Sequence, residues 1–218
     1  TFIEPEQFEA RMARLKRSGR PVLPLGEAVE RLEHNDLPDA AVVITIDDGW
    51  VSTLTHMLPV LEALELPATL YATSWYVQHR LPVINVAVDY LRSAAGRGDI
   101  DPGSETRKIE ALPMDERLAA LRAFGAGLGI GEKWLENRQF ELMTADELAE
   151  ARARGLDIQL HPHRHVEIGQ NVSALPQELA ENRAYLVEAL GTSGIDHFCF
   201  PSGSFHPDAR AMLVRAGI

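Results

Sequence analysis

The sequence lacks most of the features that mark disulfide-rich, membrane-spanning or nucleic-acid-binding proteins. Its 218 residues contain one cysteine, Cys199, which excludes an internal disulfide and slightly favours the cytoplasm as compartment. No apolar run approaches the roughly 20 residues that cross a bilayer. Lys and Arg number 21 against 32 acidic residues, giving a net charge of -11, and they form no dense basic cluster. We therefore expect neither a nucleic-acid partner nor a membrane-spanning segment, while the oligomeric state stays open.

What is present is the composition of a globular protein in which strands alternate with helices. Hydrophobic residues make up 45% of the chain, enough to bury one core, so we expect a single domain over residues 1–218. Continuous apolar runs predict buried parallel strands, and apolar residues at helical spacing predict helices between them. This alternation indicates an α/β fold, with a parallel sheet that is either open or closed into a barrel. The predicted strands cover residues 40–46, 68–72, 156–160 and 197–200, and the predicted helices include residues 8–15, 28–32, 54–64, 144–154, 179–190 and 211–214.

The stretch from about residue 75 to residue 143 interrupts this alternation. Helical patterns around residues 86–95 and 114–128 are joined by a polar segment, residues 96–106. We interpret the stretch as a helical insertion and not as a second domain. Directly after it, Thr144 and Glu147 form a capping-box pattern that opens the next helix.

Three segments with chemically active residues follow predicted strands. They are Asp47-Asp48-Gly49 after the first strand, His161-Pro162-His163-Arg164-His165 after a later one, and Pro201-Ser202-Gly203 after the last. Reactive residues of parallel α/β folds lie at the carboxyl ends of the strands, so the three segments should open on one face. Two adjacent carboxylates cost electrostatic energy unless a cation lies beside them. The alternative is a plain turn with one aspartate capping the next helix.

The spacing of His161 and His165 indicates a shared metal ion. On a helical turn, residues four apart lie on one face, about 5 to 6 Å between Cβ atoms. Pro162 fits the first position of such a turn, which would make His161 the cap residue. His163 would then point away, into solvent or toward the wall of a cleft. The alternative is a solvated loop that is rich in histidine by chance.

One aspartate and two histidines together make the ligand set of a catalytic metal site, with positions left open for water and substrate. The remaining aspartate is then free to transfer protons, and a water activated by the metal could hydrolyse an amide or ester. The turn at Pro201, Ser202 and Gly203 could direct backbone N–H groups at the developing oxyanion. Taken alone, that turn is a weak signal, because Pro-Ser-Gly is common in loops.

In order and spacing, these segments resemble the motifs of the polysaccharide deacetylase family, also called the NodB-homology domain, a group of carbohydrate esterases. The motif Thr-Phe-Asp-Asp-Gly appears as Thr45-Ile46-Asp47-Asp48-Gly49, and the motif His-Ser/Thr-x-x-His appears as His161 to His165. The resemblance implies a distorted (β/α) barrel, with Asp47 as catalytic base and Asp48, His161 and His165 as metal ligands. Zinc is the default ion, and nickel, cobalt, manganese or iron are alternatives, because this ligand set selects weakly among them.

The sequence departs from the family pattern in three places. Where many members carry an arginine that tethers the base, followed by Pro-Tyr, this chain has Cys199, Phe200, Pro201 and Ser202, so the tether is absent. Pro162 replaces the hydroxyl residue after the first histidine, which removes one hydrogen bond to the site. The family's general acid, a histidine on a later strand, would come after Ile218. We therefore expect a chain that lacks its last strands, binds metal and turns over slowly.

The expected substrate is an N-acetylated oligo- or polysaccharide, or a glycan precursor, from which the protein removes acetyl groups. Trp50 could form a floor for a sugar ring, although a tryptophan at a helix start is more often core. His206 is a weaker candidate, because a His-Pro step before a helix is usually a surface turn. The version of the last motif and the helical insertion resemble family members of capsular or surface polysaccharide assembly. Two alternatives stay open, a catalytically silent carbohydrate-binding relative and a hydrolase of cyclic amides or imides.

Overall fold

Three short parallel strands form the sheet that positions the candidate site. In the computed structural model, which describes residues 3–218, they are β1 (Thr45–Asp48), β2 (Thr69–Ala72) and β3 (Asp157–Leu160), in the order β1-β2-β3. The register sets Asp48 opposite Ala72, and Ala72 opposite Leu160. All three strands therefore end at the same level. His161, the residue after Leu160, consequently lies at the same edge of the sheet as Asp48.

The central strand is buried on both faces, whereas β1 is not. All four residues of β2 are buried, as expected for a parallel strand with neighbours on each side. In β1 the exposed residues Thr45 and Asp47 alternate with the buried Ile46. This corrects the prediction of a buried strand over residues 40–46. The apolar run before Thr45 contributes only a bridge between Val42 and Val22, and both aspartates lie within the strand.

The predicted strand over residues 197–200 is also not formed. This segment makes one parallel bridge, between Phe198 and Leu160, instead of a ladder. On the side that precedes the bridge, the side-chain oxygen of Gln159 accepts hydrogen bonds from the backbone N–H groups of Asp196 and His197, both at 3.0 Å. A side chain thus takes the place of backbone partners just before the bridge. The segment still follows the edge of β3 and reaches the site.

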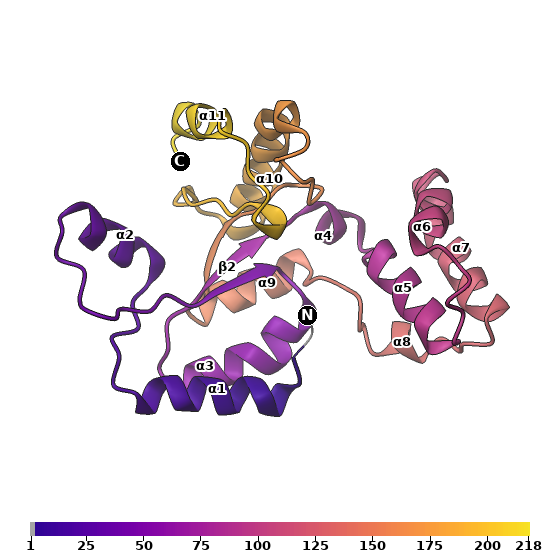
Figure 1. Ribbon diagram of the computed structural model, residues 1–218, viewed down its shortest axis with the longest axis horizontal. Helices are drawn as coiled ribbons and strands as arrows, with labels where there is room; N and C mark the ends of the chain where they lie inside the picture. Colours follow the sequence, from indigo (N-terminus) through magenta and orange to yellow (C-terminus); the bar gives the residue numbers. More distant parts are fainter. Residues whose placement is uncertain (1–2) are drawn as a thin grey trace. The chain divides into compact units, whose positions relative to one another are not determined.

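The described chain divides into two compact units (Figure 1). The first joins residues 3–78 to residues 143–218 and contains the sheet. Within it, α1 runs beside α3 and α10 beside α11. The predicted helices are found, the capping box of Thr144 and Glu147 included, and the segment from Leu54 opens with a π-helical stretch. The helices of this unit are α1 (Pro5–Arg17), α2 (Leu25–Glu33), η1 (Thr53–Met57), α3 (Leu58–Ala63), α4 (Trp75–His79), α9 (Ala145–Ala153), η2 (Val172–Ala174), α10 (Leu175–Leu190), η3 (Pro201–Gly203) and α11 (Ala209–Arg215).

The second unit, residues 79–142, is helical and nearly coincides with the predicted insertion over residues 75–143. Its helices are α5 (Ile84–Ala94), α6 (Pro102–Glu110), α7 (Met114–Gly127) and α8 (Lys133–Glu136). Helix α6 was not predicted, because its sequence is polar; Asp101 caps its start by accepting a hydrogen bond from the N–H of Ser104. The buried apolar side chains of the unit include Leu91 of α5, Ile109 of α6, Leu121 of α7, Trp134 of α8 and Phe140. That the whole chain folds as one domain stays a prediction.

The fold class is the predicted one, α/β with parallel strands and many helices. Within residues 3–218 the sheet has three parallel strands and is open. Among these residues, no helix combines the length and the apolar character needed to cross a membrane.

Candidate metal centre

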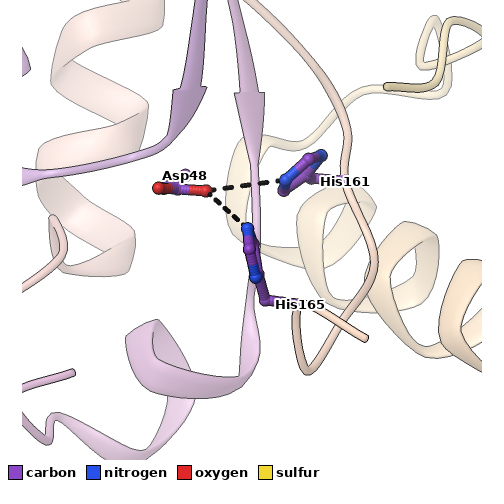
Figure 2. Close-up of side chains that lie close together, drawn as sticks. All are labelled: Asp48, His161 and His165. Carbon is purple, nitrogen blue, oxygen red and sulfur yellow. Dashed lines mark ion pairs between the residues drawn. The ribbon is translucent and has the colours of Figure 1, made fainter. Parts of the chain in front are cut away.

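The structure brings Asp48, His161 and His165 together at the carboxyl edge of the sheet (Figure 2). One ligand atom from each residue lies within 4.8 Å of those of the other two. The Oδ1 atom of Asp48 is 3.5 Å from His161 Nε2 and 3.1 Å from His165 Nε2. The imidazole rings are 5.0 Å apart between centroids and tilted by 58° to one another. The carboxylate oxygen thus faces both rings, as ligands of a shared ion must.

Two buried atoms of this cluster support the fit of a metal ion. Asp48 Oδ1 and His161 Nε2 are both buried, and neither has a hydrogen-bond partner with acceptable geometry among the described residues. Buried polar atoms are normally satisfied, because leaving one without a partner costs about 1 to 3 kcal/mol. A cation between the two atoms would satisfy both. The donor set of two imidazoles and one carboxylate also suits zinc and its neighbours in the first transition series.

The charges of Asp48 and His165 affect one another's pKa. Burial alone would raise the pKa of Asp48, but the adjacent imidazoles of His161 and His165 outweigh that effect and hold the pKa well below its usual range. The Asp48 carboxylate in turn raises the pKa of His165, against the opposing effect of burial. A cation that binds here would therefore compete with a proton on His165, and metal binding should release that proton.

Asp48 is held in an unusual backbone conformation at the end of β1. Its φ angle is +75°, a region that residues other than glycine rarely occupy, and the N–H of Gly49 donates to the carbonyl of Asp47 at 3.0 Å. Gly49 itself has a φ of +100°, which favours glycine. The chain therefore reverses within three residues. This reversal lets the Trp50 indole Nε1 donate to Asp48 Oδ2 at 3.0 Å.

His161 is fully buried and fixed at both its backbone and its ring. Its N–H donates to Asn182 Oδ1 at 3.3 Å, and its Nδ1 lies 2.9 Å from the carbonyl oxygen of Cys199. A carbonyl can only accept, so Nδ1 carries the hydrogen in this contact. In the neutral ring Nε2 then has a free lone pair, which faces Asp48. A backbone carbonyl behind the imidazole is the usual way in which proteins orient a histidine ligand.

The histidine segment is a turn and not the helical turn that the i, i+4 spacing suggested. The N–H of His165 donates to the carbonyl of Pro162 at 3.0 Å, and His165 has a φ of +57°, which ends any helical course. The chain reverses direction in this turn, and the reversal brings the imidazoles of His161 and His165 close to one another. His165 is the open side of the cluster, with 40% of its side chain exposed, whereas the side chain of His161 is 1% exposed.

The prediction that His163 faces solvent or a cleft wall is wrong, because its side chain is buried beneath the turn. Its Nδ1 lies 2.8 Å from Ser74 Oγ, and its Nε2 lies 3.7 Å from Glu181. Asn182 donates to Ser74 Oγ at 2.8 Å and to the carbonyl of Ala72 at 2.9 Å. Residues at the end of β2 and on α10 therefore support the turn from below.

The backbone of the turn is held from the same two elements. The single hydroxyl hydrogen of Thr73 is shared between the carbonyls of Pro162 and His163, whose oxygens lie 2.7 and 2.8 Å from Oγ1. The backbone N–H of Arg164 donates to Glu178 at 2.6 Å, and its guanidinium pairs with the same carboxylate at 2.9 Å. The turn that carries both histidines is thus fixed by buried polar groups that lie far away in sequence.

The second aspartate, Asp47, is exposed and lies beside Asp48 on β1. Cys199 lies close to Asp47. The pKa of its thiol is raised to about 11, mainly by burial and also by the charge of Asp47. The residue therefore stands near the predicted base, but as a neutral thiol and not as a cationic tether.

The turn predicted at Pro201, Ser202 and Gly203 is formed, as the 3₁₀ turn η3, and its role toward an oxyanion stays a prediction. Pro201 is buried, and Ser202 is exposed with a φ of +55°. Gly169, in the loop after His165, donates its N–H to the carbonyl of Ser204 at 3.2 Å. A Cβ at Gly169 would overlap Ser204 Oγ and come within 3.1 Å of the carbonyl oxygen of Phe205. The two loops are therefore in direct contact.

The remaining candidates fall in different places. Gly203 is exposed beside Ser202, with a φ of +64°. His206 lies 3.7 Å from Asp208 and accepts a hydrogen bond from its N–H, as expected for a surface turn before α11. The indole Nε1 of Trp50 donates to Oδ2 of Asp48 at 3.0 Å, and its role as a floor for a sugar ring stays a prediction.

Sequence reasoning missed Asn182 and Glu178, which hold the turn that carries His161 and His165. A signal was available, because both residues lie on the face of α10 that also buries Leu175, Leu179 and Leu186. Polar residues in an apolar stripe are buried, and buried polar groups need partners. The Cys199 carbonyl gave no such signal, since backbone contacts do not depend on residue type.

Comparisons with known proteins agree with this geometry. Residues 34–218 match the family model for polysaccharide deacetylase. A search of curated protein sequences found no match.

Among solved structures, the chain is similar to the deacetylase PplD of Streptococcus pyogenes, at 16% identity and a TM-score of 0.65, over 99% of this chain and 70% of that one. It is also similar to IcaB of Ammonifex degensii, at 19% identity and a TM-score of 0.65, over 99% and 74% of the two chains. A de-N-acetylase of Aggregatibacter actinomycetemcomitans matches at 15% identity and a TM-score of 0.62, over 99% and 76%. Likenesses at these identities establish the fold.

Proposed function

The chain belongs to the polysaccharide deacetylase family, and from that premise we propose that it is a metal-dependent hydrolase that removes acetyl groups from N-acetylated sugars of an oligo- or polysaccharide. The observation that carries the metal dependence is the cluster of Asp48, His161 and His165. Two of its buried atoms lack hydrogen-bond partners among the described residues and face one another. One of the similar structures is described as a de-N-acetylase, and another was determined with acetate bound. Acetate is the product expected of this reaction.

In this proposal the protein residues divide the work. Asp48, His161 and His165 would hold a divalent ion, with zinc as the default, and that ion would lower the pKa of water and polarise the acetyl carbonyl. Asp47, exposed beside the cluster, accepts the proton of the attacking water, and the proton passes to the sugar nitrogen as the C–N bond breaks and the amine leaves. The backbone N–H of Ser202 stabilises the oxyanion that develops on the carbonyl. The open side of the cluster at His165 is where the sugar enters.

The absence of the tethering arginine favours one competing outcome, a relative that binds carbohydrate without turnover. Cys199, at the corresponding place, supplies no positive charge to Asp47. The proposal therefore has to be tested by catalysis and not by binding alone.

The test is acetate release from N-acetylglucosamine oligomers, with a cyclic imide as parallel substrate. We expect the oligomers to be hydrolysed, activity to disappear after chelation, and zinc to restore it. Sugar binding without acetate release would favour the silent relative. Hydrolysis of the imide alone would favour the cyclic amide hydrolase. Full activity in the chelated protein would refute metal dependence.

A further inference from the structure

The two oxygens of Asp48 have separate partners. Oδ1 faces His161 and His165, and Oδ2 accepts a hydrogen bond from the indole Nε1 of Trp50 at 3.0 Å. An indole N–H is a donor only, so this contact needs no proton from the carboxylate. The residue that reaches the ligand comes only two positions later in the chain. It can do so because the backbone reverses at Asp48 and Gly49.

We propose that Trp50 is a positioning residue for metal binding, which holds Oδ2 of Asp48 and presents Oδ1 alone to the ion. The inference rests on the proposed function, because it assumes that the cluster binds a metal. An aspartate engaged through one oxygen uses one coordination position and leaves the others for water and substrate. Catalytic sites of three protein ligands need such open positions.

The conformation of the carboxylate explains why a second residue is needed. The last torsion of an aspartate side chain is broad and roughly two-fold, so the backbone does not decide which oxygen points at the histidines. The backbone of Asp48 is already in a rare conformation, with φ at +75°. The indole hydrogen bond removes the remaining rotation. A partner that orients a ligand typically changes metal affinity by about 10- to 100-fold when it is removed.

This role differs from the role of a sugar floor. A ring that only stacks against a sugar would affect substrate binding, and its N–H would not matter for the metal. A ring that positions Asp48 affects metal binding with no substrate present. Metal affinity of the substrate-free protein therefore separates the two.

The experiment measures zinc affinity by competition with a chromophoric chelator, in the wild type, in Trp50→Phe and in Trp75→Phe. Trp75 is the matched control, since its backbone N–H donates to the carbonyl of His163 at 2.8 Å, a contact that phenylalanine would keep, and its ring lies against Tyr76. A further variant carries 3-benzothienylalanine at position 50, which keeps the shape of the ring but replaces the N–H with sulfur. This variant decides the question if Trp50→Phe does not fold.

We expect both position-50 variants to bind zinc about 10- to 100-fold more weakly than the wild type, and Trp75→Phe to bind as the wild type does. Wild-type affinity in Trp50→Phe would overturn the role of Trp50 and leave the proposed function standing. Wild-type affinity in the benzothienyl variant alone would overturn it too, because ring shape and not the N–H would then matter. A wild-type protein that binds no zinc would overturn the metal centre and, with it, this inference.

Discussion

The turn that carries His161 and His165 and the turn that carries Ser202 lie next to each other but are held in different ways. The histidine turn is buried at His161 and His163, accepts a hydrogen bond from Thr73 after β2 and donates one to Asn182 on α10. The Ser202 turn is exposed at Ser202 and Gly203 and is closed by its own backbone, with the N–H of Gly203 donating to Phe200 at 3.1 Å and that of Ser204 to Pro201 at 2.9 Å.

The difference indicates which atoms have to be placed accurately. Metal ligands must converge within a few tenths of an ångström, and a fixed set of buried hydrogen bonds supplies that accuracy. The Ser202 turn offers a backbone N–H, whose direction follows from the turn itself. The histidine turn should therefore be sensitive to substitutions far away in sequence. The Ser202 turn should tolerate changes of the Ser202 side chain.

The largest expected effect concerns the ligands themselves. Asp48→Ala or His161→Ala should leave the centre without bound metal, because each removes one of three protein ligands from an open site. Metal content after gel filtration, measured by mass spectrometry, checks this. Ser202→Ala is the control and should retain the metal of the wild type. Near-stoichiometric zinc in either ligand variant would show that the cluster of Asp48, His161 and His165 is not a metal site.

Asp47→Asn should separate binding from turnover. The variant should keep its metal and lose about 10²- to 10⁴-fold in turnover, the usual range for a missing general base. The measurement is acetate release together with metal content. Loss of the metal would mean that the roles of Asp47 and Asp48 are exchanged, and full activity would mean that Asp47 is not the base.

Cys199 lies between the two turns and reports on their packing. Burial and the charge of Asp47 raise its pKa to about 11, so the reactive thiolate is scarce at neutral pH and increases only as the pH approaches that value. At pH 8 we expect the metal-free native protein to react with iodoacetamide roughly 10²-fold more slowly than the denatured protein, from the difference in thiolate fraction. Equal rates would show that the thiol is neither buried nor close to Asp47.

Asn182→Ala tests whether the remote support matters. It removes an acceptor from the His161 N–H and donors from the Ala72 carbonyl and Ser74 Oγ, all of them buried. We expect the free energy of unfolding to fall by at least about 1 to 3 kcal/mol, the cost of unsatisfied buried groups. Chemical denaturation of the metal-free protein measures it. Gln177→Ala, an exposed change on the same helix, should stay within about 0.5 kcal/mol of the wild type, and an equal loss in both variants would contradict the comparison.

The smallest effect is expected at Ser202. Ser202→Ala and Ser202→Gly both keep the backbone N–H, so turnover should stay close to that of the wild type. Glycine should be the better tolerated of the two, because the φ of +55° is strained for alanine. A loss approaching the roughly 10²- to 10³-fold of a missing oxyanion donor would show that the side chain itself takes part.

The sequence predicted where the histidine turn lies but not its local form. That the ligands would meet at the carboxyl edge followed from the alternation of strands and helices, and the register confirms that Asp48 and Leu160 lie at the same level. The local form of the histidine turn did not follow. A spacing of four residues fits a helix and a tight reversal equally well, and the reversal is formed through contacts that are 14 to 90 residues apart.

The strands predicted over residues 68–72 and 156–160 are formed, as β2 and β3. The predictions over residues 40–46 and 197–200 failed for a related reason. An apolar run identifies a segment that is buried, but pairing depends on a neighbour whose hydrogen-bonding groups are free. At residues 197–200 the side chain of Gln159 occupies two of the N–H groups that precede the bridge. The polar α6 was missed because its helix depends on its cap and on packing against α5 and α7 and not on an apolar stripe.

Gly169 has a consequence for protein engineering. Because no side chain fits between this position and the backbone at Ser204 and Phe205, the loop after the histidine turn and the loop after Ser202 cannot be exchanged independently. A chimera that takes one of these loops from a relative with a larger residue at the crossing would have to take the other as well. Libraries aimed at new sugar specificity should therefore vary residues 166–170 and 202–206 as one linked cassette.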